Sequence, residues 1–330
     1  MGAALSSFSS FEATHCLVER ATGARTPLSK TLRTYFLYST WLGCLLLQLP
    51  IMWWLLSWEH RRIASFANSP RSKGKIAGMI KAYRISVDDA ARPVQEYRSL
   101  QEHRSLQDFF TRELKPGARP IAEPSDPSGA VQPADSRVVA FPSAGEAKRL
   151  WIKGRGFSVP ALLGPGYSPA DWQECSILVS RLSPADCHRL HAPVTGRVAK
   201  ISRQGARFMS SLWVAVHSTL DVMVENERLV MEFDSEAFGP VVMVMIGASD
   251  VGTVQPLVKE GAAVAKGDEV GVFEFGGSIV ATAFRRGAIE FDADLLAHTR
   301  RCCETRVKLG SSLGRAAGGM AGAPAGGAAE

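Results

Sequence analysis

The sequence has no CxxC pair, no HExxH motif and no dense run of Lys and Arg with interleaved aromatic residues. The lack of a CxxC pair argues against a zinc ribbon or a thioredoxin-like redox motif. Six scattered cysteines in 330 residues are also too sparse for a secreted disulfide scaffold, so we expect free thiols. Without a basic, aromatic-rich run, the net charge of +6 favours an anionic membrane surface, and we expect no nucleic-acid partner.

One long apolar run is present. Residues 35–58 contain no Asp, Glu, Lys, Arg or His, and about 20 apolar residues suffice for a membrane-spanning helix. Aromatic residues gather toward the ends of the run, as in an interfacial belt: Tyr35, Tyr38, Trp53, Trp54 and Trp58. The run therefore predicts one N-terminal transmembrane helix over residues 35–58, in preference to a re-entrant or buried hairpin.

The first 34 residues carry competing targeting signals. Residues 1–34 are rich in Ser, Ala and Thr with several Arg, which resembles a mitochondrial presequence. The start Met1-Gly2-Ala3-Ala4-Leu5-Ser6 also fits the pattern for N-myristoylation. We expect a single-pass protein of the mitochondrial inner membrane, with an endomembrane location as the alternative.

The rest of the chain divides by texture. Residues 59–128 predict a helical, membrane-proximal region, because Ile76, Met79, Ile80 and Tyr83 recur at spacings of three and four. Residues 129–313 predict a compact antiparallel β domain, since short Val- and Ile-rich runs alternate with turn residues. Those runs are residues 176–179, 196–201, 212–217, 241–246 and 270–275. Residues 314–330, nearly all Gly, Ala and Pro, predict a disordered tail. The fold class is mainly β (α+β), with amphipathic helices before the β domain.

Three segments could carry chemistry. Asp135 lies in a turn before an apolar run, His188 and His191 precede a Pro and a Gly turn, and Ser278 follows two glycines. An Asp, a His and a Ser from separate segments can form a charge-oriented nucleophile. The histidine pair has no third ligand at a recognisable spacing, so we expect no metal site. From these residues alone, a hydrolase-like triad in a β domain is the interpretation.

Four short motifs add a resemblance. Residues 109–121, 133–135, 183–191 and 247–254 are similar, in this order, to the FFxRxLKPGxRPI, Pro-Ala/Val-Asp-Gly, SPxDYHRxH and GAxxVGSI segments of the phosphatidylserine decarboxylase family. The hallmark of that family is a Gly-Ser bond that the protein cuts itself. Gly277-Ser278 follows directly on a strand that resembles KGDExGxF, whereas Gly310-Ser311 lies in a segment similar to the family's ordinary ending. The resemblance therefore implies cleavage between Gly277 and Ser278.

The same resemblance implies the roles of the site residues. Asp135 orients His191, His191 is the base that activates Ser278, and Ser278 attacks the carbonyl of Gly277 and becomes a covalent pyruvoyl cofactor. The pyruvoyl group would form a Schiff base with phosphatidylserine in a membrane, giving phosphatidylethanolamine and CO2, with His188 assisting as an acid or base. Residues 1–277 and 278–330 would form a non-covalent heterodimer of a large and a small subunit, and a higher oligomer stays open.

The chain departs from the family pattern at three positions. Ser136 replaces a usual Gly, Cys187 a usual Tyr, and Ile279 the usual Thr after the cleaved serine. These departures keep open an unprocessed, inactive membrane scaffold of the same family. A biotinyl- or lipoyl-like carrier is the other alternative, because residues 191–198 and 260–268 resemble the two halves of such a barrel. No lysine between these halves has the Met-Lys-Met or Asp-Lys setting of a carrier.

Overall fold

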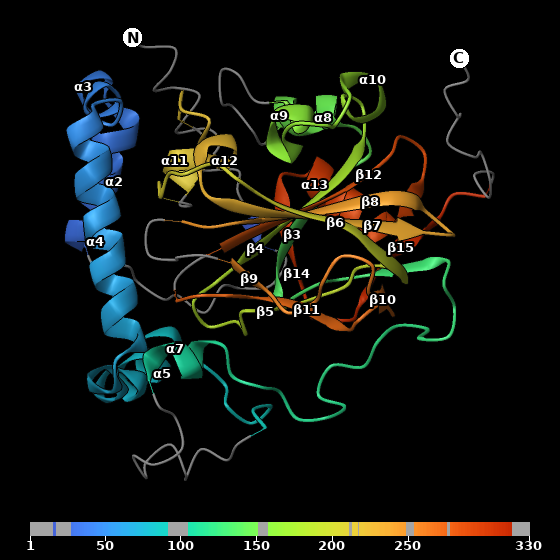
Figure 1. The fold of residues 1–330 in the computed structure, drawn as a ribbon, viewed down its shortest axis with the longest axis horizontal. Helices are drawn as coiled ribbons and strands as arrows, with labels where there is room; N and C mark the ends of the chain where they lie inside the picture. Colours follow the sequence, from blue (N-terminus) through green and yellow to red (C-terminus); the bar gives the residue numbers. More distant parts are fainter. Residues whose placement is uncertain are drawn as a thin grey trace.

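The computed structural model describes residues 16–17, 28–91, 105–150, 158–210, 213–216, 218–248, 254–275 and 278–318. Antiparallel β sheets form the centre of the molecule, and a group of N-terminal helices stands along one side of them (Figure 1). The prediction of a mainly β fold with helices is confirmed.

Three helices replace the expected membrane-spanning helix: α2 (Leu28–Ser39), α3 (Trp41–Leu46) and α4 (Pro50–Asn68). No helix in the described part of the chain is long and apolar enough to cross a membrane, so the prediction of a transmembrane helix over residues 35–58 is wrong. The breaks have local causes. The Thr40 hydroxyl caps α3 by accepting a hydrogen bond from Gly43 N at 2.9 Å, and Pro50, which has no N–H, begins α4.

The helical region continues with η1 (Pro70–Lys75), α5 (Ile76–Tyr83) and α7 (Leu106–Phe110). The predicted helical periodicity at residues 76–83 is confirmed, since Ile76 and Met79 are buried in one cluster with Phe109 and Phe110 of α7. The Ser72 hydroxyl accepts a hydrogen bond from Leu106 N at 2.8 Å and ties η1 to α7. Residues 92–104, which belong to the region that was expected to be helical, lie outside the described residues.

The largest sheet has nine strands in the order β1-β14-β3-β4-β12-β8-β7-β6-β10. Their bounds, in that order, are Cys16–Leu17, Cys303–Val307, Ser136–Phe141, Ser176–Leu182, Ser278–Phe284, Gly239–Ile246, Arg228–Ser235, Gly196–Gln204 and Ala263–Val264. All pairs are antiparallel except β1 with β14. The strand β12 is therefore the middle strand, with four strands on each side of it, and its direct neighbours are β4 and β8.

Both faces of this sheet are covered, as the side chains of β8 show. Val241, Met243 and Met245 enter one buried cluster, whereas the alternating residues Val242 and Val244 enter another. This is the two-residue period of a strand that is buried on both sides. The second cluster also holds side chains of α8 (Ala144–Leu150), α9 (Val159–Leu163) and α10 (Pro169–Trp172), which Figure 1 shows together beyond one face of the sheet.

Two three-stranded sheets share the first cluster. One has the order β5 (Arg189–His191), β11 (Glu269–Phe273), β9 (Val254–Pro256), and the other β13 (Ile289–Phe291), β15 (Ser312–Ala316), β2 (Gly129–Val131). Helix α13 (Ala293–Arg300) adds Leu295 to the same cluster. The two segments that resemble halves of a carrier barrel pair with each other, because β10 is antiparallel to β6 and Gly267 N donates to Ala192 O at 2.8 Å.

Four of the five predicted strands fall within or overlap β4, β6, β8 and β11. The fifth prediction is wrong, because residues 213–216 form the helix α11 (Trp213–Val216), followed by α12 (Val222–Glu225). A short apolar run cannot distinguish a strand from a buried helix by period alone, and here Val214 and Ala215 pack against Tyr38 of α2. The prediction of disorder is wrong for residues 314–316, because they belong to β15 and pair with β13, and residues 314 and 315 also pair with β2. Residues 319–330 lie outside the described residues.

Candidate active site

The predicted cleavage position lies at the head of β12, in the middle of the nine-stranded sheet. Ser278 is the first residue of this strand and the register partner of Leu182 on β4, and from Ile279 onward β12 also pairs with β8. Gly276, Gly277 and the side chain of Ser278 lie outside the described residues. The structure therefore places Ser278 by its backbone, on a strand that is held on both sides.

The two predicted histidines lie along the same side of β11, the strand that leads to Ser278, one near each end of its pairing with β5. His191 of β5 is the register partner of Glu269, at the start of β11. His188 lies at the opposite end of this pairing, where its carbonyl accepts a hydrogen bond from Phe273 N at 3.0 Å. Because β11 ends at Phe273 and β12 begins at Ser278, His188 lies toward the cleavage position and His191 farther back along β11.

The His188 ring is fully buried and fixed in orientation. Its Nδ1 lies 2.9 Å from the main-chain oxygen of Asp186, which can only accept, so Nδ1 carries the proton of the neutral ring and Nε2 the lone pair. The ring stacks on Phe110 with centroids 3.6 Å apart and meets Phe273 edge-on at 6.2 Å. These aromatic contacts keep water away from one side of the imidazole.

The His191 ring is held by a backbone carbonyl. Pro133 O accepts from His191 N at 3.0 Å and lies 3.3 Å from His191 Nδ1. Burial lowers the pKa of His191 below the ordinary value of histidine, while the negative charges of Glu269 and Asp135 and the Pro133 carbonyl oppose this shift. His191 is therefore neutral near pH 7, as a general base must be.

Asp135 is bound by an arginine that the motif analysis did not single out. Arg119 Nε donates to both carboxylate oxygens, at 2.9 and 3.1 Å, and Arg119 Nη2 donates to one of them at 2.7 Å. Leu309 N also donates to the carboxylate, at 2.8 Å. Arg119 also pairs with Asp89 at 2.8 Å, and its pKa is raised chiefly by the hydrogen bond to Asp135. Within the described residues, Asp135 makes no hydrogen bond to His191 and acts on it through charge alone. Its role in orienting His191 stays a prediction.

A second carboxylate, Asp186, lies next to the histidines. Its Oδ2 accepts a hydrogen bond from Ser183 N at 2.7 Å, one residue beyond the register partner of Ser278. Burial raises the pKa of Asp186 to about 6, and the charge of Asp135 acts in the same direction. The Ser183 hydrogen bond and the charges of Arg306 and Arg137 act against the shift. The sequence signal for Asp186 was its position in the histidine motif, but its burial could not be seen there.

The segment between β11 and Ser278 is fixed by Gln107 of α7. Gln107 Nε2 donates to Phe273 O at 3.3 Å, and Gln107 Oε1 accepts from Phe275 N. Phe275 also meets Phe110 with ring centroids 5.1 Å apart. The helix α7 thus anchors both the His188 ring and the chain that approaches the cleavage position.

Comparisons with known proteins agree with the motifs. A family model described as phosphatidylserine decarboxylase matches residues 106–315. Phosphatidylserine decarboxylase proenzyme 2 of Komagataella phaffii is 41% identical over 250 residues, and the phosphatidylserine decarboxylase proenzyme of Chlamydia felis is 35% identical over 278 residues. These alignments cover 75% and 84% of this chain. The chain belongs to the phosphatidylserine decarboxylase family.

The relatives in this family differ in length. The chain spans 24% of the Komagataella phaffii protein and 39% of phosphatidylserine decarboxylase proenzyme 2 of rice (Oryza sativa subsp. japonica), to which it is 40% identical. It spans 88% of the Chlamydia felis protein. The family match over residues 106–315 and the identities of 35–41% confirm the resemblance to the phosphatidylserine decarboxylase family that the motifs predicted.

The three departures from the usual pattern of this family all find partners in the structure. The Ser136 hydroxyl accepts a hydrogen bond from Gln132 Nε2 at 2.6 Å, in a buried polar group with Ser180. The buried Cys187 thiol donates to Arg112 O at 3.0 Å, and burial raises its pKa. Ile279 is 1% exposed within the cluster that covers the helical face of the large sheet. Each departure is therefore part of the packing around the site.

Proposed function

We propose that this chain is a self-processing phosphatidylserine decarboxylase, which forms phosphatidylethanolamine and CO2 with a pyruvoyl group made from Ser278. The observation that carries the proposal is the position of Ser278 at the head of a central strand, joined through a short link to the strand that His188 and His191 flank. In this family, a Gly-Ser bond at such a place fits the bond that the precursor cleaves.

The cleavage needs a base and an attacking hydroxyl. His191, neutral near pH 7, takes the proton of the Ser278 hydroxyl, and the oxygen attacks the carbonyl carbon of Gly277. The C–N bond breaks, the proton goes to the freed amino group, and an ester links the two chains. Loss of the Cα proton of Ser278 then expels the carboxylate of Gly277. Addition of water to the resulting enamine, as its imine tautomer, releases ammonia and leaves the pyruvoyl group.

The pyruvoyl group supplies an electron sink for the carbanion that loss of CO2 creates. We assign to His188 the delivery of a proton to this carbon. Its Nδ1–H is held by Asp186 O, so Nε2 is the exchanging atom: it would take up the proton that the substrate ammonium group must lose before it reacts, and then pass that proton to the carbon. Phe110 and Phe273 keep the ring in place, and Phe110 excludes water from the face on which it stacks.

The two chains would stay together without a covalent bond. After a cut before Ser278, β12, β14 and β15 belong to the small chain, and they pair with β4, β8, β3 and β2 of the large chain. The heterodimer is therefore built from strand pairs that already exist in the uncut fold.

The first experiment is the intact mass and denaturing electrophoresis of the purified protein beside Ser278→Ala, with Ser311→Ala as the matched control. We expect two chains for the wild type and for Ser311→Ala, with a small chain that begins at residue 278 and is blocked to N-terminal sequencing. Ser278→Ala should stay whole. If the wild type stays uncut, the protein is an unprocessed scaffold and the proposed enzyme activity is rejected. If the cut lies before Ser311, Ser311 and not Ser278 is the source of the pyruvoyl group.

Two histidine variants separate the two reactions. His191→Ala should remain uncut, because the base is lost. His188→Ala should still cut but should release little CO2 from phosphatidylserine vesicles, because proton delivery is lost while the pyruvoyl group still forms. Mass spectrometry of the chains and a radiometric CO2 assay measure the two steps separately. Equal loss of cleavage in both variants would contradict this division of roles.

We also propose that the enzyme acts at the mitochondrial inner membrane, with an endomembrane as the alternative. The support is the Ser-, Ala- and Arg-containing composition of residues 1–34 and the membrane nature of the proposed substrate. Fractionation of cells that express the full chain tests this, and recovery with endomembrane markers would reject the mitochondrial location.

A further inference from the structure

The strand pairing of β11 ends at Phe273, shortly before the cleavage position. Phe273 N donates to His188 O at 3.0 Å, and Phe273 is also the last residue of β11 that pairs with β9. The backbone of β5 leaves β11 at this point, since His188 N donates to Phe110 O of α7 at 3.4 Å. Residues 274 and 275 therefore have no main-chain hydrogen-bond partner in the described part of the chain.

The side-chain amide of Gln107 takes the place of a strand partner beyond this point. Gln107 Nε2 donates to Phe273 O at 3.3 Å, and Gln107 Oε1 accepts from Phe275 N. Because Phe273 and Phe275 are two residues apart, these two groups lie on one edge of an extended chain, where a paired strand would bind. A primary amide offers the one donor and one acceptor that a residue of such a strand would supply. Gln107 thus extends the pairing of β5 with β11 by one position.

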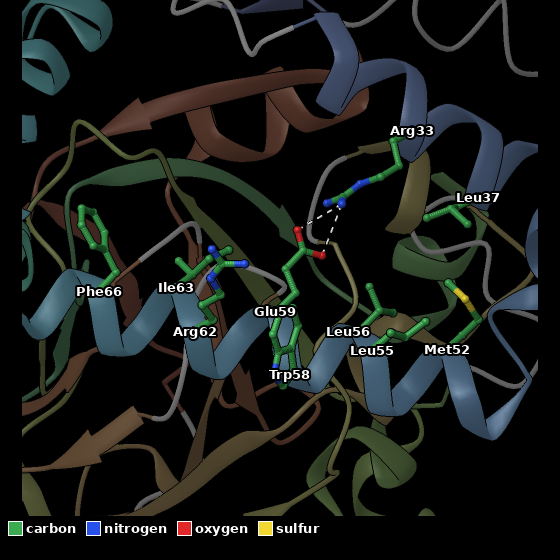
Figure 2. Close-up of a pocket in the computed structure, with 10 residues that line it drawn as sticks. All are labelled: Arg33, Leu37, Met52, Leu55, Leu56, Trp58, Glu59, Arg62, Ile63 and Phe66. Atoms are coloured by element: carbon green, nitrogen blue, oxygen red, sulfur yellow. Dashed lines mark hydrogen bonds and ion pairs between the residues drawn. The ribbon is translucent and has the colours of Figure 1, made fainter.

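The helix α7, which carries this amide, is held by the helices before it. The Ser72 hydroxyl of η1 accepts a hydrogen bond from Leu106 N at 2.8 Å and donates one to Ser69 O, just beyond the end of α4, at 2.7 Å. The helix α4 is joined to α2 by the ion pair of Arg33 and Glu59, 3.1 Å apart, which Figure 2 shows across the groove between these helices. The support of the Gln107 amide therefore extends from α7 through η1 to α4 and α2.

Two glycines, Gly276 and Gly277, link Phe275 to Ser278. The far end of this link is fixed, because β12 pairs with β4 from Ser278 onward and with β8 from Ile279 onward. Glycine has the widest range of backbone conformations, so a link that was free at its near end would present the Gly277 carbonyl in many orientations. Attack by a hydroxyl needs the two reacting atoms about 3–3.5 Å apart and aligned. A fixed Phe275 restricts the free segment to the two glycines.

We propose that Gln107 is a positioning residue for self-cleavage: its amide holds the chain at Phe273 and Phe275 so that the Gly277 carbonyl meets the Ser278 hydroxyl. This inference rests on the proposed function, because it concerns the bond that the precursor cuts. Gln107 transfers no proton and acts only through its two hydrogen bonds. Cleavage thereby comes to depend on the docking of α7, and through η1 on the helices that precede it.

Two substitutions of Gln107 in the full-length protein test this role. Gln107→Met keeps the length of the side chain and loses both hydrogen bonds, and Gln107→Glu near pH 7 loses the donor to Phe273 O. Both precursors should separate into two chains about tenfold or more slowly than the wild type at pH 7, followed by electrophoresis of pulse-labelled protein from cell-free synthesis. Gln173→Glu, at an exposed glutamine that follows α10, is the matched control and should be cut at the wild-type rate.

Acid should restore cleavage in Gln107→Glu alone, which a role in packing would not produce. A protonated carboxyl group donates through its hydroxyl and accepts through its carbonyl oxygen, as the amide does. The ordinary pKa of a glutamate is about 4.3 and burial raises it, so this half-buried position should gain its proton as the pH falls from about 7 to about 5. The rate of Gln107→Glu relative to Gln107→Met should rise over this range, because His188, His191 and Asp186 titrate in both variants.

Limited proteolysis of the uncut precursors shows whether each variant is folded. If Gln107→Met is unfolded, Gln173→Glu replaces it as the reference for the pH series. Parallel pH curves of Gln107→Glu and its reference would overturn the hydrogen-bonding role. Cleavage of a folded Gln107→Met at the wild-type rate would do the same, and the proposed function would stand. A wild type that stays whole would reject the proposed function and the role of Gln107 with it.

Discussion

Asp186 holds its carboxyl group in surroundings that disfavour the charge, and this gives the protein a pH dependence. Its native pKa is about 6, against about 3.8 for a carboxyl in water, so the native state binds more protons than the unfolded state between these values. The free energy of unfolding should therefore fall as the pH rises from about 4 to about 6, and the stabilisation is retained only below this window.

Asp186→Asn should abolish the fall in the free energy of unfolding between about pH 4 and about pH 6, because the amide oxygen still accepts the hydrogen bond from Ser183 N but carries no charge. At pH 7 the variant should be more stable than its parent by about 2 kcal/mol, whereas near pH 4 the two should be alike. Urea unfolding at several pH values in a Ser278→Ala background measures the difference. Asp171→Asn, at a half-exposed carboxyl, is the control. Parallel stability curves for Asp186→Asn and its parent would mean that Asp186 is ionised at little cost.

Arg119 determines where the Asp135 carboxylate points, because its Nε and Nη2 both donate to the carboxylate and Leu309 N is the one further donor among the described residues. Arg119→Gln should slow self-cleavage about tenfold or more, because Asp135 then loses its fixed position beside His191. Arg119→Lys keeps the charge but loses the paired hydrogen bonds, so its rate of self-cleavage should lie between those of the wild type and Arg119→Gln. The time course of chain separation after synthesis measures the rate, and Arg197→Gln is a surface control. Cleavage of Arg119→Gln at the wild-type rate would show that Asp135 needs no such support.

The strand β14 is joined to the sheet by more than its own ladder. Arg181 of β4 reaches past β3 to Glu304 of β14, with bonds of 3.0 and 2.7 Å, and Glu304 is 2% exposed. Because Glu304 lies after residue 278 and Arg181 before it, this pair would connect the small chain to the large chain after cleavage.

Glu304→Gln should weaken that connection. Removal of one partner of a largely buried ion pair leaves the other charge poorly neutralised, at a cost of about 2 kcal/mol or more. We expect the processed variant to release its small chain at a lower urea concentration than the wild type, measured by size-exclusion chromatography in urea. Glu290→Gln, at an exposed acidic residue of the same chain, should behave like the wild type.

The elements show what the sequence could and could not predict. Strands β4, β6, β8 and β11 were predictable because their Val and Ile runs lie between turn residues. The motif letters singled out Asp135, His188, His191 and Ser278, whose roles stay predictions. Arg119 and Gln107 were missed because their partners, Asp135 and the segment 273–275, are distant in the sequence. Asp186 was missed because its motif position does not reveal that its carboxyl group is buried. The apolar run at residues 35–58 misled because hydropathy does not register the Thr40 cap or the start of α4 at Pro50.

Unfolding of the whole molecule should become poorly reversible once the chain is cut before Ser278. The small chain contributes a central strand of the nine-stranded sheet, so two separated chains would have to meet again before this sheet could form. After dilution from urea, Ser278→Ala should regain its native spectrum at a rate independent of protein concentration. The processed wild type should recover poorly, and better at higher concentration. Equal recovery of both proteins at a rate independent of concentration would contradict the requirement that two separate chains associate to form the nine-stranded sheet.

In the proposed reaction, the place of Ser278 at the head of β12 makes formation of the pyruvoyl group depend on correct folding. A chain whose large sheet has not assembled does not hold β12, the strand that begins at this serine, between β4 and β8. Such a chain would have no means to make its own reactive carbonyl group. Misfolded copies would therefore lack the pyruvoyl group and stay inactive. The number of small chains with a blocked N-terminus in a cell would then equal the number of molecules that had folded correctly.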